Sequence, residues 1–472
     1  MTGRHDGQVA ATDPEVLIVG GGSAGCVLAA RLSADPSRQV TLVEAGALHV
    51  DDWPPELLDA GLIPAAHPET WQYSSALTTG RTGYLHRGRV VGGSGVVNGG
   101  YFVRATPADV DGWGTLSYSM LLPAFVRSET DLDFGGPLHG QAGPLPVRRP
   151  IDMQPSSAAF LDACRDAGVP DEPDKNAAGP PGVGPLPLNI RDGVRVNTAL
   201  AYLIPVLSRK NLQVRAGTPV VRVLIEQGRA SGAELADGAV LRAGRVVLCA
   251  GAIASAQLLM LSGVGPAGEL RRLGLLIHAD LPVGVGFSDH PDVAVARPGV
   301  VKPGARRPPG LEVTLNTATV ELRPYTAAFD QLVPGSRAGA ETYVGVALMQ
   351  PDSRGELRLR SAEPAAAPLI AHRYLATAGD RDELSDGVRL ARELLRLPDQ
   401  PDLHAWVRAN LGTSQHLVGT CALGPVVDER FRVHGVRGLQ VVDASVIPVV
   451  PSRGPHATVI ALAEYAAMLA EC

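Results

Sequence analysis

The sequence predicts an α/β fold with at least two lobes, and three observations predict it. The chain has 472 residues, 45% of them hydrophobic, which is enough for a large core. Near its start, two apolar β-branched runs flank a glycine-rich turn and an apolar periodic segment. Segments rich in Pro and Gly recur at 51–68, 135–150, 171–187 and 300–310, and we interpret them as crossings between lobes.

The first predicted element is a βαβ unit that ends at Glu44. The spacing Gly20-x-Gly22-x-x-Gly25 removes side chains where a backbone would approach a pyrophosphate, and the next helix points its first amides at that charge. Glu44 stands where a carboxylate can accept both ribose hydroxyls of an adenosine and repel a 2′-phosphate. The unit therefore predicts a dinucleotide site, and it leaves FAD and NAD both open. Its strands are predicted at 15–19 and 40–43 and its helix at 26–32.

The rest of the chain shows weaker periodicity. The run at 246–265 has the length of a membrane span, but its serines, glycines and one glutamine favour a buried strand, a turn and a helix. No fixed-period repeat is present, which argues against solenoids and propellers. Strands are predicted at 213–224 and 245–250, and helices at 254–261, 382–395 and 457–470.

Charge and cysteine content exclude several classes of function. Lys and Arg total 42 against 48 Asp and Glu, a net charge of -6 without a basic block, so nucleic-acid binding is not expected. The five cysteines are scattered without a C-x-x-C pair, which predicts no metal site and favours a reducing, cytoplasmic location. Residues 1–14 are polar and predict a short disordered leader rather than a secretory signal. No transmembrane segment is predicted, while peripheral membrane association and the oligomeric state are left open.

Several motifs in order resemble the glucose-methanol-choline (GMC) flavoprotein oxidoreductases over nearly the whole chain. The glycine-dense segment 88–98 resembles the first signature of that family, and 251–265 resembles the second. Further matches lie at 43–46, 71–73, 280–286, 289–290 and 441–445.

The resemblance implies a Rossmann-like FAD-binding domain assembled from discontinuous segments, with an α+β substrate lobe whose sheet covers the flavin ring. We place the FAD domain at 12–150, 212–290 and 405–472, and the substrate lobe at 151–211 and 291–404. Val97 stands where some choline-oxidising members carry a histidine that bonds to FAD, so a noncovalent FAD is expected; Ala256 replaces the usual proline of the second signature. The expected FAD-binding residues are Gly20, Gly22, Ser23, Ala24, Gly25, Glu44, Ala45, Arg89, Val91, Gly92, Gly93, Ser94, Asn98, Gly99, Val220, Ala250, Gly251, Asp443 and Ala457.

Two histidines near the C-terminus are the predicted catalytic pair. His416 lies in a box that resembles the family's H-x-x-G-T-C, and His456 falls where the family has its second active-site His or Asn. Imidazole titrates near neutral pH, so one ring can take the hydroxyl proton of an alcohol while the second holds the same oxygen. We expect His416 to be the acid/base and His456 its partner. By resemblance His434 and His290 are structural, and Cys421 is expected to be a packing residue.

The substrate is inferred from resemblance alone. Segments 98–104, 136–140 with 143–149, and 321–326 resemble the mycofactocin-associated branch of the family. This implies a dehydrogenase that reoxidises reduced mycofactocin, a peptide-derived redox carrier, and passes two electrons through FAD to a further acceptor such as the respiratory chain. The alternatives are a small-alcohol or sugar oxidase that makes hydrogen peroxide, a flavin-containing hydroxynitrile lyase, and a noncatalytic flavin-binding protein.

Overall fold

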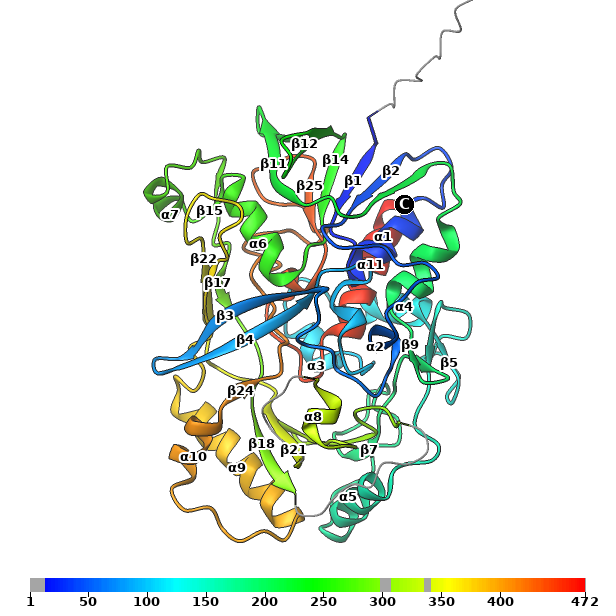
Figure 1. The fold of residues 1–472 in the computed structure, drawn as a ribbon, viewed down its shortest axis with the longest axis vertical. Coiled ribbons are helices and arrows are strands. Elements are labelled where there is room, and N and C mark those ends of the chain that lie inside the picture. The colour runs from blue at the N-terminus through cyan, green and yellow to red at the C-terminus, as the bar shows by residue number, and fades with distance from the viewer. Residues whose placement is uncertain (1–12, 298–306, 335–340, 472) are drawn as a thin grey trace, which may run out of the picture.

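The structure, a computed structural model, describes residues 13–297, 307–334 and 341–471 (Figure 1). Most of the predicted leader and the first part of the predicted crossing at 300–310 lie outside these residues.

A five-stranded parallel sheet forms the nucleotide-binding part of the fold. Its pairing order, β10-β2-β1-β14-β25, brings together strands from the start, the middle and the end of the chain, as a doubly wound sheet does. The helix α1 (Ser23–Leu32) follows β1 and packs against the C-terminal helix α11 (His456–Glu471). The strands are β1 (Val16–Val19), β2 (Val40–Val43), β10 (Leu212–Arg215), β14 (Arg245–Leu248) and β25 (Leu439–Val441).

The carboxyl ends of these strands place predicted site residues at one edge of the sheet. Gly20 follows β1, Glu44 follows β2, and Ala250 comes two residues after β14. Asp443 comes two residues after β25, and its side chain accepts the Ser445 amide at the start of a short 3-10 helix. Ligands of doubly wound sheets bind at this edge, so the topology itself assembles the predicted dinucleotide site.

A six-stranded sheet forms the opposite part of the molecule, at the bottom of Figure 1. All of its strand pairs are antiparallel, and α9 (Ala378–Leu394) packs against it. Its order is β24 (Gly412–Thr413), β18 (Pro291–Arg297), β21 (Thr342–Leu348), β20 (Val320–Pro324), β19 (Val313–Asn316) and β7 (Val183–Pro185).

A third sheet crosses between these two parts, with the long hairpin of β3 and β4 at its edge (Figure 1). It joins strands from the predicted FAD segments with two strands from 291–404, so strand pairing crosses the predicted domain border, and the domain division stays a prediction. Its order is β17 (Val285–Phe287), β22 (Gly355–Arg358), β23 (Leu369–Ala371), β3 (Thr70–Thr78) and β4 (Arg81–Gly88).

The remaining elements are helices and small sheets of two or three strands. They include a three-stranded sheet of β11 (Val220–Glu226), β12 (Arg229–Leu235) and β13 (Val240–Arg242), the strands β5 (Glu129–Asp131) and β6 (Leu145–Val147), and the helices α3 (Pro107–Asp111), α4 (Tyr118–Ser128), α5 (Pro155–Asp166), α6 (Gly251–Leu261), α7 (Ala267–Arg272) and α10 (Leu403–Asn410). Two-residue strands pair as β8 (Ile190–Arg191) with β9 (Val194–Arg195) and β15 (Val264–Gly265) with β16 (Ala279–Asp280), and two further helices have four residues each, α2 (Pro55–Leu58) and α8 (Phe329–Leu332).

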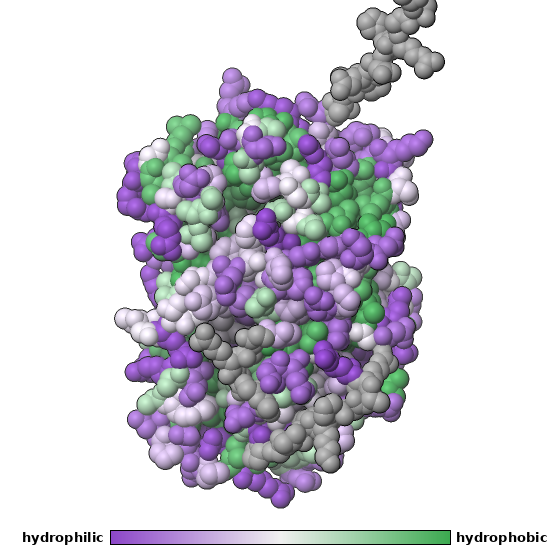
Figure 2. Space-filling view, in the orientation of Figure 1, coloured by the Kyte–Doolittle hydropathy of each residue, from purple (hydrophilic) through white to green (hydrophobic). Residues whose placement is uncertain are grey.

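The hydrophobic core has two main parts, one around the parallel sheet and one under the six-stranded sheet. A small third cluster, Val103, Leu186, Leu188 and Leu311, packs separately from both. On the visible surface, hydrophobic residues form patches separated by hydrophilic ones (Figure 2). Within the described residues, no helix has the length and apolar character needed to cross a membrane.

Most predicted elements are confirmed with shifted ends, and one is corrected. The helices α6 and α9 begin three and four residues earlier than predicted, and Thr377 caps α9 by accepting the Asp380 amide. The predicted strand 213–224 is wrong in extent: it is two strands, β10 and β11, in different sheets. Gly217 adopts φ +63° and Pro219 lacks an amide hydrogen, so the chain turns between them.

Candidate active site

A cavity of about 660 Å³ lies at the carboxyl edge of the parallel sheet and extends to both predicted catalytic histidines. Main chain and side chains from widely separated segments line it, as the predicted discontinuous assembly requires. The predicted residues that line it are Gly20, Gly22, Ser23, Ala24, Glu44, Ala45, Gly93, Ser94, Asn98, Gly99, Val220, Ala250, Gly251, Asp443, His416 and His456.

Glycine backbones form one wall of the cavity. Gly22 is the N-cap of α1 and supplies no side-chain cap, so the first amides of the helix are left for another partner. A Cβ atom on Gly93 would lie 2.6 Å from Gly22 Cα, and one on Gly20 would lie 2.5 Å from Cys249 O. These contacts leave no room for side chains, and the open helix N-terminus suits a pyrophosphate.

The two acids of this wall are held by main-chain amides. The Gly21 amide donates to Glu44 Oε2 and the Gly46 amide to Glu44 Oε1, each at 2.8 Å. Each carboxylate oxygen keeps a second lone pair for a hydroxyl. Asp443 Oδ2 accepts the Gly251 amide at 2.8 Å and the Ser255 hydroxyl at 2.6 Å. Burial raises the pKa of both Glu44 and Asp443, against these hydrogen bonds.

Five predicted FAD residues do not line the cavity, and each has another place. Gly25 packs against the turn, because a Cβ atom there would lie 1.9 Å from Gly20 O. The Arg89 guanidinium stacks on the Trp71 ring, 4.5 Å from its centre. Gly92 shapes the glycine loop at φ +102°, and its amide donates to Gly21 O. Val91 and Ala457 are fully buried.

Hydrogen bonds fix the tautomer of His416. His290 Nε2 lies 3.1 Å from Met349 O and 3.0 Å from Pro451 O, so this nitrogen must carry the hydrogen. In neutral His290 the Nδ1 atom is then an acceptor, and it lies 2.9 Å from His416 Nδ1. His416 Nδ1 therefore donates, which leaves Nε2 as the basic nitrogen of a side chain that lines the cavity.

The surroundings keep these imidazoles neutral. Burial and the nearby His290 and Arg323 lower the pKa of His416 well below its usual range. Burial lowers the pKa of His290 to about 4, against the charge of Asp289. A neutral ring is the form that can accept a proton.

Asp289 holds the loop that carries His416. Its Oδ1 atom accepts the backbone amides of His416 and His290, both at 2.7 Å. Its Oδ2 atom accepts His372 Nε2–H and the Thr413 hydroxyl, both at 3.0 Å. Although burial acts in the opposite direction, the hydrogen bond and charge of His372 hold the pKa of Asp289 well below its usual range.

His456 stands at the start of α11 with a free ring nitrogen. Its Nε2 atom is buried without a hydrogen-bond partner, which is costly unless a ligand supplies one. Burial, with the charge of Arg195, lowers its pKa to about 4. A Cβ atom on Gly95 would lie 3.0 Å from His456 Cε1 and 3.1 Å from Ser23 Oγ, so the glycine loop lies close to both Ser23 of the glycine wall and the His456 ring.

Several residues around the cavity were missed by the sequence analysis. Arg87, Tyr101 and Gln415 line the cavity, and the Tyr101 hydroxyl donates to buried Glu321 at 2.7 Å. His290 was expected to be structural, and it is the direct partner of His416. Asp289 and His290 come directly before β18, and β18 pairs with β24, the strand before His416. This pairing is a long-range contact, which local sequence periodicity does not show.

Two further residues named from the sequence, His434 and Cys421, do not line the cavity. His434 Nε2 lies 2.9 Å from Gly424 O at the surface. Cys421 is fully buried, and burial raises its pKa well above the usual range. None of the four described cysteines forms a disulfide. Within the described ranges, one group of metal-ligand type occurs, Glu129, Asp131 and His139, and none of its members lines the cavity.

The residues present fit an FAD molecule. One cavity contains the glycine wall, the uncapped helix N-terminus, the two acids and the His456 nitrogen that lacks a hydrogen-bond partner. This cavity is large enough for the dinucleotide portion of a cofactor and a small substrate.

Comparison with known proteins agrees with this geometry. Family models described as GMC oxidoreductase match residues 15–292 and 351–463. An uncharacterised GMC-type oxidoreductase of Rhodococcus erythropolis is 43% identical, over 96% of this chain and 98% of that protein. Pyridoxine 4-oxidase of Microbacterium luteolum is 32% identical, over 95% of this chain and 98% of that protein. The crystal structure of pyridoxine 4-oxidase from Mesorbium loti superposes with a TM-score of 0.90 at 30% identity, covering 97% of this chain and 99% of that one.

These matches span both ends of the chain, including the glycine wall and both catalytic candidates, His416 and His456. Proteins of the matched family are FAD-binding oxidoreductases that act on CH–OH donors. The chain belongs to the GMC oxidoreductase family.

Proposed function

We propose that the protein is an FAD-dependent dehydrogenase that oxidises a CH–OH group, with His416 as the base and His456 as its partner. The observation that carries this proposal is the hydrogen-bond chain from Met349 O and Pro451 O through His290 to His416. It leaves one unprotonated imidazole nitrogen on a side chain that lines the cavity.

The two imidazole rings have different roles at the hydroxyl group of the substrate. His416 Nε2 accepts the hydroxyl proton as the carbonyl forms, and its Nδ1–H stays bound to His290. The orphaned Nε2 of His456 hydrogen-bonds to the same oxygen and holds the carbon in place. Bound FAD would supply the acceptor for the hydride that leaves this carbon. Both residues are partly buried, and both side chains line the cavity.

The FAD would be held without a covalent bond. Gly22, Ser23 and Gly93 would hold its pyrophosphate, and Glu44 its adenosine ribose. Val97 offers no nucleophile at the position where some members carry a histidine. Acid precipitation of the holoprotein should therefore leave yellow flavin in the supernatant, and a yellow pellet would contradict this part of the proposal.

We further propose reduced mycofactocin as the donor and a respiratory-chain component as the acceptor. The segments that resemble the mycofactocin branch touch one another beside the cavity. Tyr101 of the first bonds to Glu321 of the third, and Arg104 of the first donates to Leu138 O of the second at 2.6 Å. Of these contacting residues, Tyr101 lines the cavity, and its bond to Glu321 supports a role for the first and third segments in recognising one donor.

Anaerobic mixing of the holoprotein with candidate donors tests the proposal. The panel contains reduced mycofactocin, choline, pyridoxine and simple primary alcohols, and the flavin absorbance is followed in time. We expect fast bleaching with reduced mycofactocin and slow or no bleaching with the others. Fast bleaching by another alcohol would retain the dehydrogenase and reject this donor.

The same setup separates the alternatives. Rapid release of hydrogen peroxide under air would identify an oxidase. Cyanide release from a cyanohydrin, without bleaching by any donor, would identify a hydroxynitrile lyase. A flavin that neither this panel nor simple sugars bleach, in a protein that releases no cyanide, would favour a noncatalytic flavin-binding role.

A further inference from the structure

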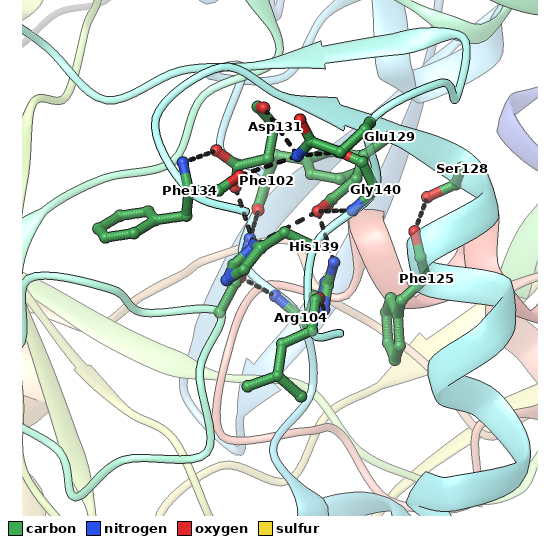
Figure 3. Close-up of polar contacts among 12 residues, drawn as sticks. Phe102, Arg104, Phe125, Ser128, Glu129, Asp131, Phe134, His139 and Gly140 are labelled. Carbon is green, nitrogen blue, oxygen red and sulfur yellow. Dashed lines mark hydrogen bonds and ion pairs between the residues drawn. The ribbon is translucent and has the colours of Figure 1, made fainter. Parts of the chain in front are cut away.

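A buried cluster of charged side chains surrounds His139 outside the cavity (Figure 3). Its ring stacks on Phe134, and 5% of the residue is exposed. Three carboxylates and two guanidinium groups surround it. They are Glu129 and Asp131 of β5, Asp174 of the loop before β7, Arg104 and Arg149.

The guanidinium groups already occupy the carboxylates that a metal ion would need. Arg149 Nη1 lies 2.5 and 2.6 Å from the two oxygens of Asp131. Arg104 Nη2 lies 2.5 Å from Glu129 Oε1, and the Gly140 amide donates to the same oxygen at 3.3 Å. A divalent cation among these oxygens would meet two fixed positive charges at short range, so the cluster disfavours a metal.

Both ring nitrogens of His139 lie within ion-pair distance of carboxylates. Nε2 hydrogen-bonds to Asp174 Oδ2 at 2.8 Å. Nδ1 lies 3.0 Å from Asp131 Oδ2 and 3.6 Å from Glu129 Oε1, close enough for charge attraction but without hydrogen-bond geometry (Figure 3). In a neutral ring, one nitrogen would direct a lone pair at a carboxylate. The three carboxylates and two guanidinium groups nearest the ring sum to one negative charge, which an imidazolium balances. The partly exposed Asp133 carboxylate, 3.8 Å from Arg149, adds a further negative charge that also favours the imidazolium.

We propose that His139 is an imidazolium that serves as a positioning residue, holding Asp174 and, through it, the Phe102–Ala105 segment against the start of α11. The charge state of His139 stands on its own contacts, whereas its effect on catalysis rests on the function proposed above. The Glu129 carboxylate, followed by the charges of Asp174 and Asp131, raises the pKa of His139, against the effect of burial.

A chain of hydrogen bonds connects the cluster to the active site. Asp174 Oδ1 accepts the Asn176 amide at 3.1 Å. The Asn176 side chain accepts the Arg104 amide at 2.9 Å and donates to Phe102 O at 3.2 Å. The Phe102 ring meets His456 edge-on, with ring centres 6.2 Å apart. The segment is fixed on both sides, because the Ala105 amide donates to Thr458 Oγ1 of α11 at 3.1 Å.

The sign of the pH dependence follows from the raised pKa. The stabilisation that His139 provides is complete below its unfolded pKa of about 6.5 and is lost as the pH rises through the higher folded value. Acidification within this range leaves the cluster intact, and alkali removes the proton that neutralises it.

The charge state can be measured on the holoprotein without any substrate. Exchange of the histidine C2 hydrogen in D2O, followed by mass spectrometry over a range of pH, reports the pKa of each histidine. We expect the midpoint for His139 to lie above the ordinary histidine value of about 6.5. A midpoint for His139 below about 6.5 would overturn the proposal.

Substitution tests the positioning role. His139→Gln cannot present two charged donors, so we expect its melting temperature to be lower than wild type at pH 6 and the difference to shrink toward pH 9. Flavin content should be kept while the donor-dependent rate of flavin reduction falls about 10- to 100-fold. His404→Gln, at an exposed site, is the matched control and should leave the melting temperature, the flavin content and the reduction rate unchanged.

The outcomes separate this inference from the proposed function. If no donor reduces the wild-type flavin, the proposed function fails, and the exchange midpoint still decides the charge of His139. A wild-type reduction rate in His139→Gln would overturn the positioning role. A stoichiometric divalent metal in purified protein that His139→Gln loses would overturn the imidazolium.

Discussion

The nucleotide wall and the histidine wall of the cavity are built by different means. Glycine backbones, strand ends and main-chain amides form the first, and its acids are themselves held by amides. Side chains bonded to other side chains form the second, as between His290 and His416, which lie 126 residues apart in the sequence. The first wall therefore depends on which residues lack a side chain, and the second depends on the identity of a few side chains.

The largest effect should come from breaking the histidine wall. His416→Ala removes the proposed base and leaves the glycine wall untouched, so flavin content should be kept. The rate of flavin reduction by a saturating donor should fall by about 10²–10⁴-fold, as loss of a general base typically costs. Stopped-flow absorbance measures this rate. His404→Ala, at an exposed site, is the control, and an unchanged rate in His416→Ala would reject the assignment.

The next largest effect should come from breaking the contact between the helices α1 and α11, which connects the two walls. The helices α1 and α11 begin at the nucleotide wall and at His456, and buried Glu464 joins them. Its carboxylate binds the Arg31 guanidinium at 2.7 Å and the Tyr202 hydroxyl at 2.8 Å. Glu464→Gln leaves these groups without their charged partner, and we expect a loss of about 3 kcal/mol in the free energy of unfolding.

Urea unfolding of the apoprotein measures this loss. Asp171→Asn, which breaks the exposed ion pair with Arg165, is the control and should cost less than about 1 kcal/mol. Equal losses in the two variants would show that the tie between the helices contributes no more than a surface pair.

A smaller effect should come from filling the nucleotide wall. Gly22 has an ordinary backbone conformation, and a Cβ atom there would lie 3.7 Å from Gly93 Cα, so the protein accepts a side chain at this position. Gly22→Leu should then extend into the cavity and weaken FAD binding by about 10- to 100-fold, the cost of overpacking. Fluorescence titration of the apoprotein with FAD measures the affinity. Gly80→Leu, at a glycine with no neighbour within 4 Å, should bind FAD normally.

The two walls also differ in how far the sequence predicts them. The spacing Gly20-x-Gly22-x-x-Gly25 and the acid after β2 predict the nucleotide wall because each is local to one βαβ unit. Arg89 shows the limit of this reasoning, since its side chain stacks on Trp71, which lines the cavity, while Arg89 itself does not line it.

The histidine wall depends on contacts between distant segments. His416 and His456 could be named by resemblance, but the role of His290 becomes visible only when β18 and β24 pair and bring the two rings together. The cluster around His139 has the same character, because its charges come from four separate segments. No hydrophobic periodicity or motif spacing in the sequence predicts such contacts.

The smallest effect should come from the residue where the two walls meet. Gly95→Ala adds one methyl group that would lie 3.0 Å from His456 Cε1 and 3.1 Å from Ser23 Oγ. The His456 ring must move by a few tenths of an ångström, so flavin reduction should slow about two- to tenfold while FAD affinity changes less. If the methyl group acts through the ring, it should have no further effect in a His456→Ala background. A loss of FAD affinity larger than the loss of rate would instead assign Gly95 to the nucleotide wall.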